Sequence, residues 1–176
     1  MYKRILVPFD GSPTSERGLR EAVLLAQDQG ARLRILNVVE EYVLVQGAGF
    51  DGGGLYTGEM LDLLIADSKK IVAKGLAQAA RRGVEAEAST IKSFANRSSE
   101  SIVEEAKKWR ADLIVMGTHG RRGVSRLMLG SDAEIVVRTA DVPVLLVRAP
   151  EAEAKAKAKE KTKAKPKAPA KKAKAS

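Results

Sequence analysis

Short apolar runs alternate along the first 149 residues with segments whose apolar residues recur at helical spacing. The runs predict strands over residues 5–9, 33–39, 84–91, 112–116 and 142–147. A regular alternation of strands and helices is typical of a parallel sheet with helices on both faces. The alternation therefore predicts an α/β three-layer sandwich, and the 149 residues are enough for one such domain.

Turn and capping residues set the ends of the predicted helices. Ser12 followed by Pro13 suits an N-cap and a first helical position, and Gly30 closes the helix that follows. The second helix ends at Gly83, and the third begins near Ser98 and places Trp109 in the core. The last helix covers residues 131–139, whereas the glycine-rich residues 40–57 predict a long loop, a candidate lid near a ligand.

The composition limits where the protein works and which chemistry it can use. The chain has no cysteine, which excludes disulfides and thiolate metal sites and fits a reducing compartment. No apolar run reaches the ~20 residues that a membrane helix needs, and the N-terminus lacks a signal-peptide core. We therefore expect a cytoplasmic protein that does not bind membranes.

The net charge of +9 is concentrated at the C-terminus. Residues 151–176 hold ten Lys and three Glu, a net charge of +7, which leaves +2 for the rest of the chain. We expect residues 150–176 to be a disordered Lys/Ala-rich tail beside the domain of residues 1–149. The tail either neutralises phosphates of nucleic acid or another polyanion, or only increases solubility, and the sequence favours neither.

A glycine-rich stretch after the fourth predicted strand has the features of a phosphate site. Gly117 and Gly120 allow backbone N–H groups to approach an anion closely, and Gly130 and Ser131 open the last helix. The start of a helix adds free N–H groups and the positive end of its dipole. Positive charge nearby comes from Arg121, Arg122 and Arg126. The stretch predicts the phosphate-binding half of a nucleotide site.

Asp10 follows the first predicted strand as Gly117 follows the fourth. Ligands of open parallel sheets bind at the carboxyl ends of the strands, so these residues should meet at one edge. Asp10 could accept a hydrogen bond from a ribose hydroxyl, or could simply form a turn with Gly11. Val38 and Val39 could form an apolar wall for adenine, which is compatible with a place in the core.

The spacing Gly117-x2-Gly120-x9-Gly130-Ser131, with an opening KRILVPFDGS and a closing VPVLLVR, resembles the ATP-binding branch of the universal stress protein family. The resemblance implies the strand order 3-2-1-4-5 of adenine nucleotide alpha hydrolase-like folds. It also implies a stress-response regulator that binds ATP (or ADP/AMP), with Mg²⁺ inferred from the triphosphate, and a homodimer through the strand from Val142 to Val147. The nucleotide-binding positions are then Pro8, Asp10, Val38, Val39, Met116, Gly117, Gly120, Arg121, Gly130, Ser131 and Asp132.

Asp132 departs from the family, in which neutral residues are common at this position. Its carboxylate suits the first turn of a helix but would repel a terminal phosphate if it pointed inward. The choice between ATP and ADP or AMP therefore stays open.

No residue stands out as catalytic. The only histidine, His119, has no cysteine or acidic cluster around it, so we expect an exposed loop residue rather than a metal ligand. The chain lacks the GxxxxGK[ST] loop of P-loop NTPases, and the GxGxxG match at residues 47–52 does not open a helix. ATP hydrolysis should be slow at most. The alternatives are a slow adenine-nucleotide hydrolase and a nucleotide-free interaction module that its tail tethers to nucleic acid.

Overall fold

A computed structural model gives the fold, and it describes residues 1–40, 58–93, 98–120 and 129–148. The strands of the sheet are β1 (Arg4–Pro8), β2 (Arg32–Glu40), β3 (Ala86–Ser93), β4 (Leu113–Gly117) and β5 (Val144–Val147). The helices of the described residues are α1 (Pro13–Gln29), α3 (Gly58–Ala80), α4 (Ser98–Trp109) and α5 (Ser131–Thr139). The predicted loop after residue 40, the predicted tail and the three arginines of the glycine-rich stretch lie outside the described residues.

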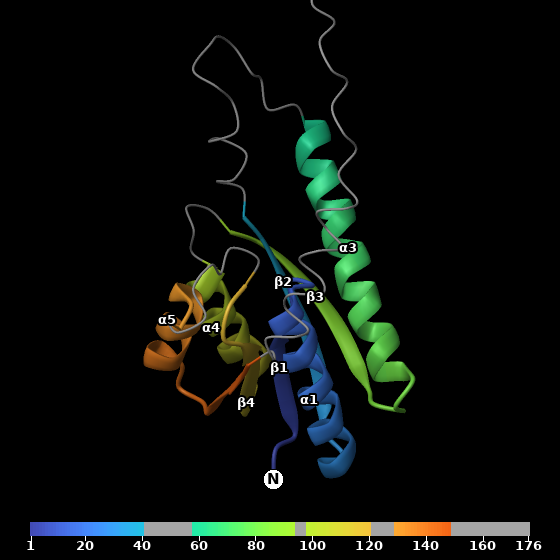
Figure 1. Cartoon of the computed structure of the whole chain (residues 1–176), viewed down its shortest axis with the longest axis vertical. Helices are drawn as coiled ribbons and strands as arrows, with labels where there is room; N and C mark the ends of the chain where they lie inside the picture. The colour runs from blue at the N-terminus through green and yellow to red at the C-terminus, as the bar shows by residue number, and fades with distance from the viewer. Residues whose placement is uncertain (41–57, 94–97, 121–128, 149–176) are drawn as a thin grey trace, which may run out of the picture.

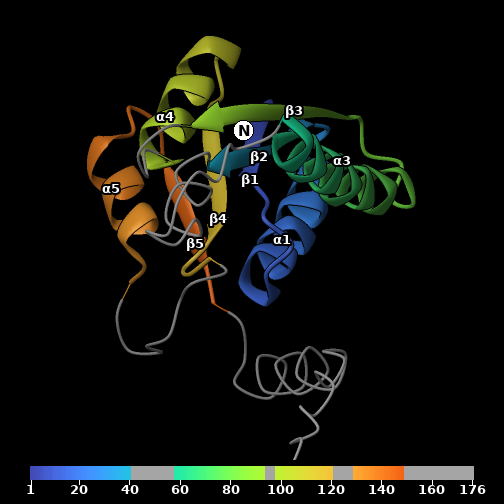
Figure 2. The same cartoon turned by 90° about the horizontal axis from the view of Figure 1, so that it is seen from above.

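The five strands form one parallel sheet in the order β3-β2-β1-β4-β5 (Figure 1). Seen from above, α1 and α3 lie on one face of the sheet, and α4 and α5 lie on the other (Figure 2). The predicted α/β sandwich and the order 3-2-1-4-5 are therefore confirmed. No helix of the described ranges combines the length and the apolar character that crossing a membrane requires.

Each face of the sheet has its own aliphatic core. On one face, side chains of α1 such as Leu19 and Val23 pack on Ile5, Val7 and Ile35 of the strands. The core of the other face joins β1, β2 and β4 to α4 and α5, and it includes Trp109, which is 7% exposed. The prediction that Trp109 belongs to the core is confirmed.

Capping residues act as predicted at both ends of α1. The Ser12 hydroxyl accepts a hydrogen bond from the Ser15 N–H at 3.2 Å, and Pro13 is the first helical residue. Gly30 has a left-handed backbone with φ of 62° and caps the C-terminus. Since both signals are local in the sequence, they can be recognised without knowledge of the tertiary fold.

Two predicted strands begin two residues too early. The third starts at Ala86, because the Val84 N–H donates to the Ala79 carbonyl and completes the cap of α3 around Gly83, whose φ is 67°. The fifth starts at Val144 rather than Val142, because Pro143 has no N–H to donate, although its carbonyl accepts a bond from Ile114.

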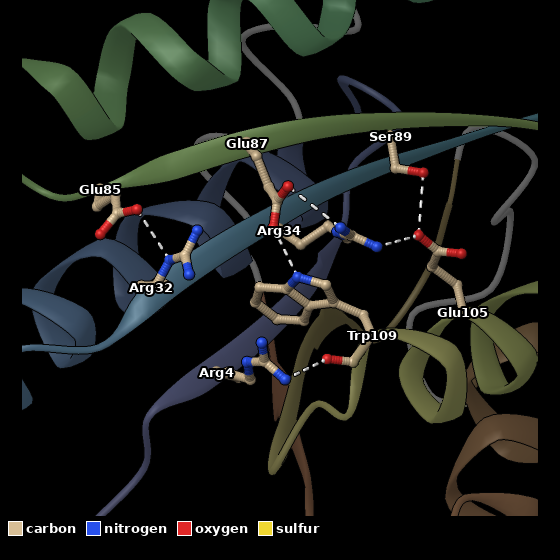
Figure 3. Close-up of polar contacts among 8 residues, drawn as sticks. All are labelled: Arg4, Arg32, Arg34, Glu85, Glu87, Ser89, Glu105 and Trp109. Carbon is tan, nitrogen blue, oxygen red and sulfur yellow. Dashed lines mark hydrogen bonds and ion pairs between the residues drawn. The ribbon is translucent and has the colours of Figure 1, made fainter.

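A polar cluster fixes α4 to the amino-terminal half of β2 and β3 (Figure 3). The Arg34 guanidinium donates to Glu105 at 2.7 Å, pairs with Glu87 at 3.1 Å and lies 4.9 Å from the ring centre of Trp109. Trp109 donates its Nε1–H to Glu87 at 2.6 Å, and the Ser89 hydroxyl donates to Glu105 at 3.1 Å. Glu105 is buried, and these partners compensate for the desolvation of its charge.

The hydrogen bonds and charges of this cluster lower the pKa of Glu87. Burial by itself raises the pKa of Glu87, but hydrogen bonds from Arg34 and Trp109 and the charges of Arg34 and Arg32 outweigh it. The pKa of Glu87 therefore lies below its usual value of 4.5. Since the carboxylate form is favoured in the folded protein, Glu87 contributes stability that acid removes.

Candidate functional site

Most of the residues that the sequence predicts to bind a nucleotide lie at or just beyond the carboxyl ends of the strands (Figure 1 shows the strands). Pro8 ends β1, Val38 and Val39 lie near the end of β2, and Met116 and Gly117 end β4. Gly130 is the N-cap of α5, and Ser131 and Asp132 are its first two residues. The remaining predicted positions are Asp10 and Gly120, which are described, and Arg121, which lies outside the described residues.

Asp10 and Gly120 meet at this edge. Asp10 Oδ1 accepts a hydrogen bond from the Ser12 N–H at 2.9 Å, so the carboxylate does hold the turn that leads into α1. A Cβ atom at Gly120 would lie 3.2 Å from Asp10 Oδ2. Asp10 therefore has a structural function in this turn, whether or not it also contacts a ligand.

Gly117 is needed for packing, whatever it binds. A Cβ atom at Gly117 would lie 2.8 Å from the carbonyl carbon of Thr14 and 2.9 Å from the backbone nitrogen of Ser15. Opposite it on α1 is Gly18, where a Cβ atom would come within 3.3 Å of the Gly117 nitrogen. Two glycines therefore let the first turns of α1 approach the end of β4.

Gly130 also has a structural task. Its N–H donates to the Thr118 carbonyl at 2.9 Å, and a Cβ atom at Gly130 would lie 3.0 Å from that oxygen. The first hydrogen bond inside α5 runs from the Glu134 N–H to the Gly130 carbonyl at 2.9 Å. The N–H groups of residues 131–133 precede that bond, so they are the amides that α5 can offer to an anion.

The first turn of α5 contains one residue that favours phosphate binding and one that opposes it. Ser131, the first residue of α5, is exposed, and the N-cap residue Gly130 has no side chain that could bind the free amides of the helix start. Asp132 is half-buried in the same turn, where its negative charge favours the helix dipole.

The structure corrects the expectation for His119. Its side chain is half-buried, its Nδ1 lies 3.0 Å from the Thr118 hydroxyl, and its carbonyl accepts a hydrogen bond from the Thr14 hydroxyl. The sequence analysis missed Thr14, which ties the glycine turn to α1, and Thr118, whose carbonyl accepts the hydrogen bond from the Gly130 N–H. It also missed Asn37, a buried amide that donates to the Phe9 carbonyl at 2.7 Å and holds the end of β1 on β2.

Metal-ligand clusters are not found in the described ranges, where no three or more His, Asp or Glu residues come together as they would around an ion. The chemistry of this edge is instead that of backbone amides, hydroxyls and the two carboxylates of Asp10 and Asp132, each near the start of a helix. Such groups bind polar ligands with phosphates and hydroxyls.

Comparisons with known proteins agree with this fold. The family model of the universal stress protein family matches residues 1–148. Universal stress protein MJ0531 of Methanocaldococcus jannaschii is 34% identical over 151 residues, which cover 86% of this chain and 85% of that protein. The solved structure of universal stress protein UspA from Lactobacillus plantarum matches with a TM-score of 0.70 and 27% identity, over 84% of this chain and 98% of that one.

A second solved structure adds a ligand. The universal stress protein from Archaeoglobus fulgidus in complex with dAMP matches with a TM-score of 0.60 and 24% identity, over 83% of this chain and 98% of that one. At that identity the likeness concerns the fold. Together, the match of the family model over nearly the whole domain and the identity to a relative of similar length show that this chain belongs to the universal stress protein family.

Proposed function

We propose that this protein is a stress-response regulator that binds an adenine nucleotide at the carboxyl edge of its sheet. The observation that carries the proposal is the meeting of Asp10 and Gly120 at the edge where the first turn of α5 begins. Asp10 would accept a hydrogen bond from a ribose hydroxyl, and the amides of residues 131–133 would bind phosphate. Val38 and Val39, one strand beyond β1, would contact the base.

The choice among ATP, ADP and AMP depends on the start of α5. The amides and the Ser131 hydroxyl favour a phosphate there, whereas the half-buried Asp132 carboxylate opposes a further negative charge. Mg²⁺ bound with the triphosphate would offset that repulsion. We therefore expect the preference for ATP over AMP to require Mg²⁺.

The proposal includes a homodimer through β5. This strand is an edge of the sheet, and its Leu145 is 42% exposed. Ile135 and Val137 of the neighbouring α5 add exposed apolar surface. Pairing two copies at β5 would satisfy the open edge and cover part of this surface.

Titration calorimetry with ATP, ADP and AMP, with and without Mg²⁺, tests the proposed function. Asp10→Asn should weaken binding about tenfold, because it replaces one carboxylate oxygen and removes the charge that strengthens the ribose hydrogen bond. Asp28→Asn is the matched control, since it makes the same change on an exposed residue near the other end of α1. Equal affinities of Asp10→Asn and wild type would contradict the assigned role, and an absence of binding by wild type would reject the function.

A further inference from the structure

A second polar cluster lies at the carboxyl ends of β2 and β3, beyond the nucleotide contacts proposed above. Ser93 is the last residue of β3 and is paired in register with Glu40, the last residue of β2. Glu40 Oε1 accepts a hydrogen bond from the Ser98 hydroxyl at 2.6 Å, and Ser98 is the first residue of α4. The cluster thus joins the ends of two neighbouring strands to the start of a helix.

Ser93 lies on the α4 face of the sheet, as Glu40 does. Alternate residues of a strand share a face, and Ser89, four residues earlier on β3, donates to Glu105 of α4. Ile91, between them in this series, packs in the core beneath α4. The side chain of Ser93 is therefore directed to the side from which Ser98 reaches Glu40.

The buried Ser93 hydroxyl is unusual because it makes no hydrogen bond. The residue is only 3% exposed, and its Oγ has no hydrogen-bond partner. Among the buried side-chain nitrogen and oxygen atoms of the described residues, only Arg34 Nε also lacks a partner. Leaving a buried hydroxyl unpaired is unfavourable, and such groups are uncommon in folded proteins. A group of this kind beside a helix start is explained if a ligand supplies the missing partner.

The position of Ser93 along the sheet edge indicates which part of the proposed nucleotide would lie beside it. The proposed contacts run along the sheet edge from α5 and β4 for phosphate, through Asp10 after β1 for ribose, to β2 for the base. β3 is the next strand in this order, about 4.8 Å further on. Ser93 therefore lies where the outer edge of the base would end.

We propose that the Ser93 hydroxyl accepts a hydrogen bond from the 6-amino group of bound adenine and determines the specificity for that base. The inference rests on the proposed function. The Glu40 carboxylate beside Ser93 is an acceptor only, so this end of the site favours a ligand group that donates. An amino group donates, whereas the 6-oxo group of hypoxanthine or guanine would face the carboxylate with its own lone pairs.

The test combines two protein variants with two ligands. Wild type, Ser93→Ala and Ser89→Ala are titrated with ATP and with purine riboside 5′-triphosphate, which carries hydrogen in place of the 6-amino group. Wild type should bind ATP about 3- to 10-fold more tightly than the analogue, the range expected for one hydrogen bond. Ser93→Ala should bind both ligands equally, at the affinity of wild type for the analogue.

Thermal unfolding without ligand separates this contact from a structural effect. Ser93→Ala should keep or raise the melting temperature, because the free protein loses no hydrogen bond. Ser89→Ala should lower it, because the bond to Glu105 is lost, and should keep the preference for ATP.

The outcomes distinguish the inference from the function on which it rests. If wild type binds ATP but does not distinguish it from the analogue, or if Ser93→Ala keeps the preference, the contact with the base is wrong and the nucleotide site stands. If wild type binds neither ligand, the proposed function fails and the inference with it.

Discussion

Gly117→Ala should destabilise the fold, although the sequence assigns this glycine to a phosphate site. The added Cβ atom would lie 2.8 Å and 2.9 Å from backbone atoms of Thr14 and Ser15, where an ordinary contact begins near 3.4 Å. Both neighbours belong to the first turn of α1, so a rigid element must move by about 0.5 Å. Overpacking of this kind costs about 2 kcal/mol.

For a domain of this size, 2 kcal/mol corresponds to a fall of roughly 4–8 °C in melting temperature. Differential scanning calorimetry of the protein without nucleotide measures it directly, and the absence of ligand removes any contribution from lost binding. A melting temperature within about 1 °C of wild type would refute the packing argument.

Gly120→Ala is the matched control, three residues further along the same turn. Its Cβ atom would meet Asp10 Oδ2 at 3.2 Å, and the end of a side chain can move where a backbone cannot. This variant should lose less than about 0.5 kcal/mol of stability but bind ATP several-fold more weakly, because Asp10 is displaced. The two variants thus separate packing from ligand binding within one glycine motif.

Three further results are expected. Gly130→Val should abolish ATP binding, and, because its Cβ atom would lie 3.0 Å from the Thr118 carbonyl oxygen, calorimetry should also show a loss of stability; unchanged ATP affinity would refute the role of Gly130. Glu87→Gln should be less stable than wild type above pH 4.5, and the difference should vanish as pH falls through the lowered pKa of Glu87, which urea unfolding at several pH values can follow. Full-length protein should bind DNA more tightly at low salt than residues 1–149 do, if the ten lysines of residues 151–176 neutralise phosphates; equal weak binding in a salt series would favour a tail that only solubilises.

The sequence predicts the layers of this fold because the signals are periodic and local. Apolar runs and capping residues such as Ser12 and Gly30 need no tertiary information. The strand order came from the family resemblance, since periodicity alone does not say which strands pair. The last strand was predicted to start too early for a related reason. Hydropathy marks Val142 as apolar, but it does not take into account that Pro143 has no N–H to donate to a neighbouring strand.

The sequence predicts that the candidate residues lie at one edge of the sheet, but it does not give the structural task of each residue. Glycine spacing does not show whether a glycine leaves room for a ligand or for another part of the chain. Gly117 leaves room for the backbone of Thr14. The Arg34 cluster could not be predicted from the sequence for a different reason. Its members Arg34, Glu87 and Glu105 are distant in sequence and become neighbours only when β2, β3 and α4 assemble.

We propose above that an adenine nucleotide binds at the carboxyl edge of the sheet. Titration of ¹⁵N-labelled protein with Mg·ATP, followed by backbone amide chemical shifts, tests it most directly. The largest shifts are expected at Asp10, Gly120 and residues 131–133, with little change at Arg34 and Trp109 near the other end of the sheet. Shifts confined to the Arg34 cluster, or none at millimolar ATP, would contradict it.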